Sequence, residues 1–133
     1  MANWLGPKGL GMTLLRVVVG IVFVMHGGQK LFFIGFRNVA GFMGSLGIPL
    51  PWLAAVVVTL VEFLGGLALI LGYFARTAAA LLAIVMLVAV LAVHLKHGFF
   101  APAGFEFPLT LLAANLALLL SGPGALSLDG GRR

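Results

Sequence analysis

Two residues that could exchange protons with a ligand, Glu62 and His26, lie within strongly apolar stretches of this chain. Glu62 is one of only three acidic residues, and it lies midway along the apolar run from Trp52 to Tyr73. A carboxylate in bilayer hydrocarbon costs at least about 2.5 kcal/mol unless it faces protein, water or a partner. Carboxylates and imidazoles are the usual proton-exchanging groups of proteins. We therefore predict that Glu62 and His26 are candidate catalytic residues.

Other polar side chains near the ends of the apolar stretches could bind a ligand beside Glu62. These candidate ligand-binding residues are Arg16, Lys30, His94 and Glu106. At ~1.5 Å per helical residue, His26 lies ~10 Å, Glu62 ~15 Å and Arg16 ~26 Å from the outward end of its helix. Lys30, His94 and Glu106 lie near those outward ends. We expect an outward-opening polar pocket with Glu62 at its floor, His26 closest to it in depth, and Arg16 within reach from below.

Each of these residues also has a purely structural interpretation. Glu62 could form an ion pair or hydrogen bond that ties the first apolar stretch to the second. Arg16 could extend to the cytoplasmic interface, and Glu106 could simply complement a helix dipole. His94 and His97 are three residues apart, as metal ligands on one helix face are, but histidines at a helix end are commonly interfacial. We predict no metal site.

Composition indicates an integral membrane protein. Of the 133 residues, 62% are hydrophobic and 8% are charged, whereas a soluble domain carries about 25% charged residues. A bilayer is therefore the first expected partner, and the length allows one domain, residues 1–133. The net charge of +5 comes from dispersed basic residues, which membrane topology explains without nucleic-acid binding. The absence of cysteine excludes disulfides and CxxC redox chemistry within the chain.

Four apolar stretches predict an all-α, four-helix membrane bundle. The expected spans cover about residues 9–33, 52–73, 76–95 and 107–120. The fourth is short for a hydrocarbon core of ~30 Å, so it needs flanking residues or local thinning. Glycines and prolines between the first two spans predict a loop over residues 34–51. Pro108 is expected at the first position of the fourth helix.

Helical spacing gathers small and polar residues on one face of each of the first two spans. We expect these faces to meet because small residues let helices approach closely. On the first span the stripe is Arg16, Gly20, Phe23, Gly27 and Lys30; on the second the face is Ala55, Thr59, Glu62, Gly66 and Tyr73.

Four spans place both termini on one side of the membrane. The excess of basic residues on that side predicts that both termini are cytoplasmic. The terminal side carries Lys8, Arg16, Arg76, Arg132 and Arg133, and the other side carries Lys30, Arg37 and Lys96.

The ordered motifs of the chain resemble those of DoxX family membrane proteins over roughly residues 12 to 129. The matching pattern is Leu15-Arg16…Gly20…Phe23…His26-Gly27…Lys30, Gly47-Ile48-Pro49, Glu62…Gly65-Gly66…Leu71-Gly72…Arg76, His94…Gly98-Phe99, Glu106-Phe107-Pro108 and Gly122-Pro123-Gly124…Ser127-Leu128-Asp129. The resemblance implies a four-helix protein of the bacterial inner membrane, linked to quinone-dependent oxidoreductases and to membrane complexes that handle thiol stress. It implies quinone as the cofactor and a soluble oxidoreductase as a partner. It supplies no proven catalytic residue.

Two functions follow from the residues and the resemblance. The first is the membrane subunit of a quinone-linked oxidoreductase system, in which His26, Lys30 and Glu62 contact the quinone head and pass protons. Its electrons would come from a partner or a bound substrate. The alternative is a non-enzymatic membrane scaffold, or a binding protein for lipid or another small apolar ligand. A proton or ion path is disfavoured because the charges gather in the outer half. Formation of a homo-oligomer would bury more of so small a bundle, although no residue specifies an interface.

Overall fold

The computed structural model describes residues 6–130, and this part of the chain is helical with connecting turns. The first half contains α1 (Pro7–Gly28), its π-helical continuation η1 (Gln29–Ile34), α2 (Phe36–Ser45) and α3 (Pro51–Leu71). The second half contains α4 (Ala75–Val88), its π-helical continuation η2 (Ala89–His94), the 3-10 turn η3 (Leu95–His97) and α5 (Glu106–Ser121).

Three continuous helices within residues 6–130 are long and apolar enough to cross a bilayer, and α5 is a shorter apolar helix. The three long helices are Pro7–Ile34, Pro51–Leu71 and Ala75–His97. This confirms the predicted all-α membrane bundle. Pro51 starts α3, where a missing N–H costs nothing, and Gly72 ends it with a left-handed φ of 68°.

The start of α5 differs from the expected one. The helix begins at Glu106, so Pro108 is its third residue rather than its first. Proline is tolerated there because the N–H groups of a first turn have no intrahelical partner.

Residues 34–51 contain a helix, α2, so the prediction of a loop throughout this segment is wrong. Phe36, Val39, Ala40 and Met43 recur at helical spacing. Val39 and Ala40 are buried against Ala55 of α3, with Met43 packed beside them. Burial of this face outweighs the low helix propensity of the glycines in the segment.

The predicted contact between the first two spans is confirmed. At the crossing of α1 and α3, a Cβ placed on Gly66 would lie 2.7 Å from the carbonyl oxygen of Gly20. A Cβ on Gly27 would collide with the backbone of Phe63. Only glycine allows the two backbones to come this close.

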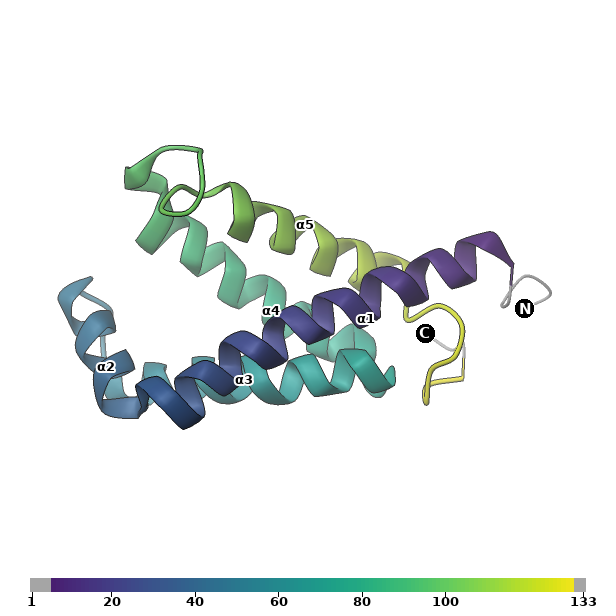
Figure 1. Cartoon of the computed structure of the whole chain (residues 1–133), viewed down its shortest axis with the longest axis horizontal. Coiled ribbons are helices and arrows are strands. Elements are labelled where there is room, and N and C mark those ends of the chain that lie inside the picture. The colour runs from purple at the N-terminus through teal and green to yellow at the C-terminus, as the bar shows by residue number, and fades with distance from the viewer. Residues whose placement is uncertain (1–5, 131–133) are drawn as a thin grey trace.

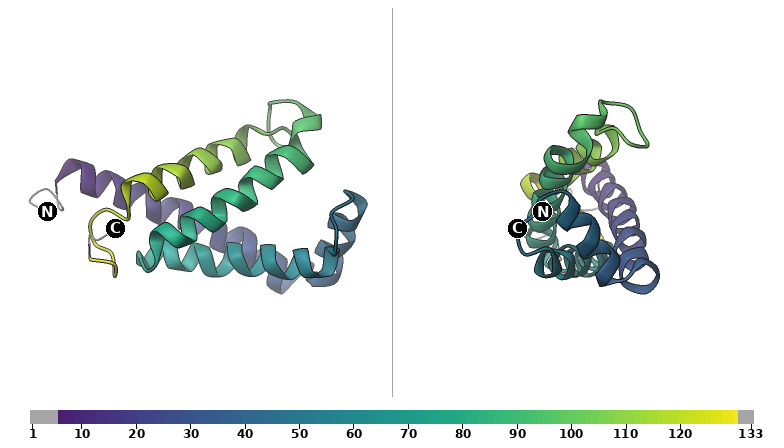
Figure 2. Two further views of the ribbon diagram at one scale, coloured as in Figure 1. Left: turned by 180° about the vertical axis from the view of Figure 1, so that it is seen from behind. Right: turned by 90° about the vertical axis from the view of Figure 1, so that its left-hand side faces the viewer.

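The helices form two pairs that converge at one end and splay at the other. α1 packs on α3, and α4 packs on α5 (Figures 1 and 2). We call the splayed end, where α2 and the 98–105 loop lie, the outer end. The opposite end, the terminal end, carries both ends of the chain, as four spans require. The predicted basic residues Arg132 and Arg133 lie outside the described residues.

The apolar core lies where the two helix pairs converge. Its side chains come from α1, α3, α4 and α5, so the pairs share one core there. The buried members are Val19, Phe23, Leu69, Ala75, Ala78, Ala79, Leu82, Met86, Leu111 and Leu118.

Candidate functional site: a cavity at the outer end

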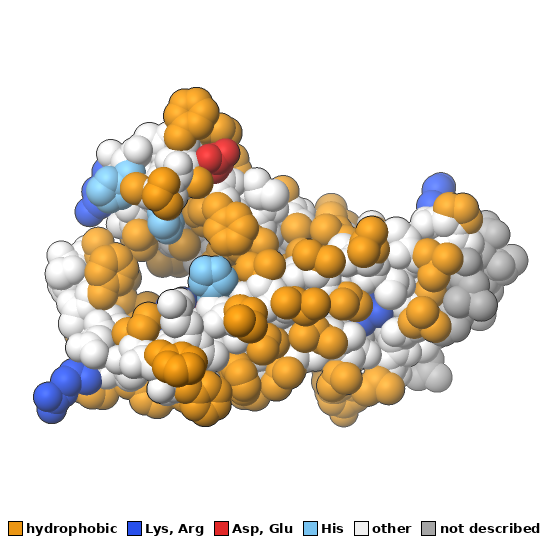
Figure 3. All heavy atoms as spheres, viewed as in Figure 1, with side chains coloured by type: hydrophobic (Ala, Val, Ile, Leu, Met, Phe, Trp, Pro, Cys, Tyr) orange, Lys and Arg blue, Asp and Glu red, His pale blue; other side chains and the backbone are white. Residues whose placement is uncertain are grey.

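Where the helix pairs splay, they enclose a cavity of about 580 Å³. The space-filling view shows the outer half of the molecule hollowed, with histidine side chains at the border of the opening (Figure 3). Four of the six predicted site residues line this cavity: His26, Lys30, Glu62 and His94. The structure therefore brings together residues from three different helical segments.

Glu62 and Lys30 form an ion pair in the cavity wall. Glu62 is only 3% exposed, while the Lys30 side chain is 24% exposed. The prediction that His26 lies closest to Glu62 in depth does not identify the partner of the carboxylate: the Lys30 ammonium, one turn further along the helix, donates to Oε1. Lys30 lies in the π-helical segment η1, and such segments frequently occur at functional sites.

His26 lies at the edge of the cavity between α1 and α5. Its exposed ring lies 6.0 Å from the ring of Phe107, at an interplanar angle of 41°. It therefore occupies the border between the cavity and the surroundings of the molecule.

His94 faces the cavity from the end of η2, the second π-helical segment. Its Nδ1 lies 2.8 Å from the carbonyl oxygen of Ala103, and because a carbonyl only accepts, Nδ1–H is the donor. In the neutral ring this assigns the lone pair to Nε2. The 98–105 loop thus sets both the orientation and the tautomer of His94.

Arg16 lies outside the cavity, at the terminal end. Its guanidinium is fully buried and donates five hydrogen bonds of 2.7–3.1 Å to backbone carbonyls. The acceptors are Leu69 and Ile70 of α3 and Pro123, Ala125 and Leu126 of the C-terminal segment. All its donors are used, so Arg16 neither reaches Glu62 nor extends to the interface.

Two further contacts hold the terminal end. The carboxylate of Asp129 accepts hydrogen bonds of 3.0 Å from the N–H groups of Phe74 and Ala75, which caps α4. Arg76 of α4 donates to the carbonyl of Leu119 in the last turn of α5 at 2.7 Å. With Arg16, these side chains form what we call the terminal clasp.

Glu106 also lies outside the cavity lining. Its carboxylate accepts a hydrogen bond of 2.5 Å from the Ala101 N–H and so holds the 98–105 loop. Within residues 6–130 no group of three or more metal-ligating side chains is present. His97 is exposed at the end of η3 and is not part of the cavity wall.

The sequence did not reveal most of the apolar wall. The helix α2 supplies Val39, Phe42 and Met43, and the helical spacing in this segment was the available signal. α4 and α5 supply the opposite wall, which includes Val85, Met86, Ala89, Phe107, Pro108 and Leu111.

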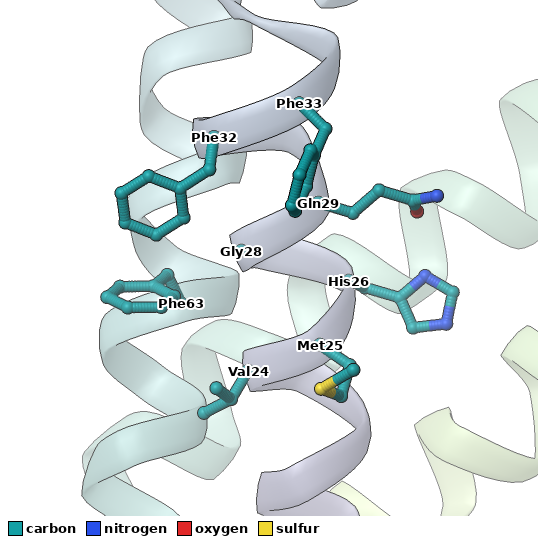
Figure 4. Close-up of a pocket in the computed structure, with 8 residues that line it drawn as sticks. All are labelled: Val24, Met25, His26, Gly28, Gln29, Phe32, Phe33 and Phe63. Atoms are coloured by element: carbon teal, nitrogen blue, oxygen red, sulfur yellow. The ribbon is translucent and has the colours of Figure 1, made fainter.

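A second hollow, of about 560 Å³, lies on the outside of α1 and α3. Figure 4 shows Phe32 and Phe63 together on one side and His26 and Gln29 projecting on the other. His26 is shared with the cavity, so the two spaces adjoin at this side chain. The full lining is Val24, Met25, His26, Gly28, Gln29, Phe32, Phe33 and Phe63.

Comparison with known proteins places the chain in a family. The family model described as DoxX matches residues 11–95. A Bacillus subtilis protein named "Putative oxidoreductase CatD" is 37% identical over 90% of this chain and 85% of its own length. Two Escherichia coli proteins are also similar. Inner membrane protein YphA is 32% identical over 89% of this chain and 87% of its own length. Inner membrane protein YqjF is 33% identical over 92% of both chains.

No solved structure matches this chain. The family match spans α1 to η2 and includes His26, Lys30, Glu62 and His94, which line the cavity. This chain therefore belongs to the DoxX family and is a multi-pass membrane protein.

Proposed function

We propose that this chain is the membrane subunit of a quinone-linked oxidoreductase system of the bacterial inner membrane, and that the outer cavity binds the quinone head. The observation that carries the proposal is the Lys30–Glu62 ion pair in the wall of an otherwise largely apolar cavity. Intramembrane ionisable residues mark ligand or proton sites by default. The name of the Bacillus relative, "Putative oxidoreductase CatD", supports the oxidoreductase link. The names of the two Escherichia relatives support a place in the inner membrane.

The lining fits a quinone in size and in chemistry. A volume of about 580 Å³ is within the range of about 300–1,000 Å³ that small-molecule sites occupy. Lys30 and the histidines can donate hydrogen bonds to carbonyl oxygens, while Phe42, Met86 and Phe107 offer apolar contact to a ring. A bound quinone would supply a redox couple that takes up protons together with electrons.

The residues of the chain would then handle the protons and the position of the head. The Lys30 ammonium has three N–H donors. One of them donates to the Glu62 carboxylate, and another can donate to a ligand oxygen. Glu62 Oε atoms accept or release a proton at the buried floor. His26, at the edge of the cavity, exchanges protons with the bound head group. Electrons come from a soluble oxidoreductase partner.

Substitution of Glu62 by Gln tests the proposal. We expect Glu62→Gln in lipid nanodiscs to weaken quinone binding by about tenfold, because the Lys30 ammonium loses the carboxylate that holds it in place to donate to the ligand. Asp129→Asn makes the same carboxylate-to-amide change at the terminal end, where the amide oxygen can still accept a hydrogen bond, so it is the matched control and should bind like the wild type. Unchanged affinity and unchanged reduction in Glu62→Gln would refute the role of this residue.

A non-enzymatic scaffold or lipid-binding protein is the second candidate. It is favoured by the fact that the Lys30–Glu62 pair joins α1 to α3 without any ligand. Spectra of the purified protein separate the two functions. A co-purified quinone absorbance that changes on addition of reductant supports the first function, and a phospholipid found by mass spectrometry supports the second.

A further inference from the structure

We propose that the hollow on the outside of α1 and α3 holds the isoprenoid tail of the quinone whose head occupies the outer cavity. This inference rests on the proposed function and extends it: the ligand is an amphiphile with a long flexible tail, and its route is lateral, from the bilayer past His26.

The two spaces adjoin at one side chain, as such a ligand requires. His26 lines both of them, and its ring lies between them, beside Phe107 of α5. The polar groups at the junction, His26 and Gln29, project to the same side of α1 (Figure 4). A head group would lie beyond them in the cavity, and a tail would lie on the apolar side.

The hollow itself has the chemistry of a tail site. Phe32 and Phe63 meet edge to face at 5.8 Å and an interplanar angle of 81°, which forms an aromatic wall. Phe33 is 85% exposed and Met25 is 67% exposed, so the hollow opens away from the protein, on the surface of a membrane-spanning helix. These side chains face the hydrocarbon from which a tail would arrive.

The hollow would act by giving the tail a path rather than by adding hydrophobic energy. Lipid chains are as apolar as the lining, so a tail gains little free energy by leaving the bilayer for the hollow. A head group fixed in the cavity nevertheless needs an exit for its tail. Blocking that exit should exclude long-tailed ligands and leave short ones unaffected.

Gly28 offers a way to fill the hollow. A Cβ at Gly28 would make ordinary contacts, 3.7 Å from the Phe63 ring, so Gly28→Leu adds bulk to the lining without a backbone collision. Gly11→Leu is the matched control, because it is on the same helix and its Cβ would meet nothing within 4 Å. Both changes replace a helical glycine and raise helix propensity alike.

Two probes are titrated in nanodiscs: a benzoquinone with a long isoprenoid tail, and the same head group with a methyl in place of the tail. We expect Gly28→Leu to weaken binding of the long-tailed probe by about tenfold relative to Gly11→Leu, because a head group in the cavity then lacks an exit for its tail. Binding of the tail-free probe should match the control.

The remaining outcomes overturn the inference in distinguishable ways. If Gly28→Leu binds both probes as Gly11→Leu does, or loses both equally, the hollow is not a tail site, while the proposed function stands. If the wild-type protein binds neither probe, the proposed function fails and the tail site fails with it.

Discussion

Glu62 and Lys30 form an ion pair that joins α1 to α3, and we propose that it also serves the chemistry of the cavity. The carboxylate is buried, so removing only its partner leaves a charge without compensation. We expect Lys30→Met to lower the free energy of unfolding by about 3 kcal/mol, the lower end of the range for buried pairs, since the Lys30 side chain is 24% exposed. Thermal unfolding in detergent measures the loss.

The double variant Lys30→Met/Glu62→Met separates the two roles of the pair. Replacing both charges by apolar groups should restore most of the stability, since buried pairs are often no better than apolar contacts of similar volume. Quinone binding should nevertheless be weaker than in the wild type, as we expect for Glu62→Gln. Recovery of binding together with stability would show that the pair only ties α1 to α3.

Arg16 has a structural role at the opposite end of the molecule. Its planar guanidinium donates to five carbonyls, and an ammonium has only three donors in a different geometry. Arg16→Lys is expected to destabilise the protein by about 3 kcal/mol, because buried carbonyls lose their partners. The exposed Arg37→Lys is the control, with a change within about 0.5 kcal/mol. Equal melting temperatures for the two variants would contradict this role.

These residues also show what the sequence could and could not predict about the site. The cost of a charge in hydrocarbon pointed to Glu62, and helical spacing correctly placed it on the face that meets the first span. Spacing also placed Lys30 on the facing stripe of the first span, but the count of depth favoured His26 because it left out the reach of a lysine side chain. Arg16 could not be assigned correctly because its partners are backbone carbonyls of a C-terminal turn, and no side-chain pattern reveals those.

At the scale of elements, the glycine contact between α1 and α3 decides how closely the helices pack. A methyl group on Gly66 would lie 2.7 Å from the Gly20 carbonyl oxygen, so the helices must separate to accept it. Gly66→Ala should therefore cost about 1–3 kcal/mol despite the better helix propensity of alanine. Gly11→Ala, with open space at its Cβ, should gain up to about 1 kcal/mol. Melting temperatures that rise in both variants would show that the helices are not in close contact.

The spanning helices were predictable because long apolar stretches and their glycine and proline boundaries have few alternatives in a bilayer. The helix α2 was not predictable in this way, because its glycines suggested a loop. Its buried face, Val39 and Ala40, becomes clear only from the contact with Ala55. The cavity follows from that helix, since α2 supplies one wall at the outer end. The splay between the helix pairs, which creates the volume, has no signal in the sequence.

At the scale of the whole molecule, the two ends have different tasks. In the terminal clasp, Arg16 joins α1 to α3 and to the C-terminal segment, and Asp129 joins that segment to α4. Arg76 joins α4 to α5. The outer end leaves the helix pairs apart and places the cavity between them (Figure 1). A closed end that fixes the helix pairs allows the other end to keep an open, ligand-sized space.

The direction in which the cavity faces is open to a direct test, because the chain contains no cysteine and any introduced thiol is the only one. Arg16, Arg76 and Lys30 donate hydrogen bonds within the protein, so the remaining excess of basic residues is Lys8, Arg132 and Arg133 against Arg37 and Lys96. The positive-inside rule then predicts a cytoplasmic terminal end and an outward cavity. In intact spheroplasts, a membrane-impermeant maleimide should label Arg37→Cys but label Lys8→Cys only after permeabilisation, both positions being exposed. The reverse pattern would place the cavity on the cytoplasmic side, where a soluble electron donor could reach it directly.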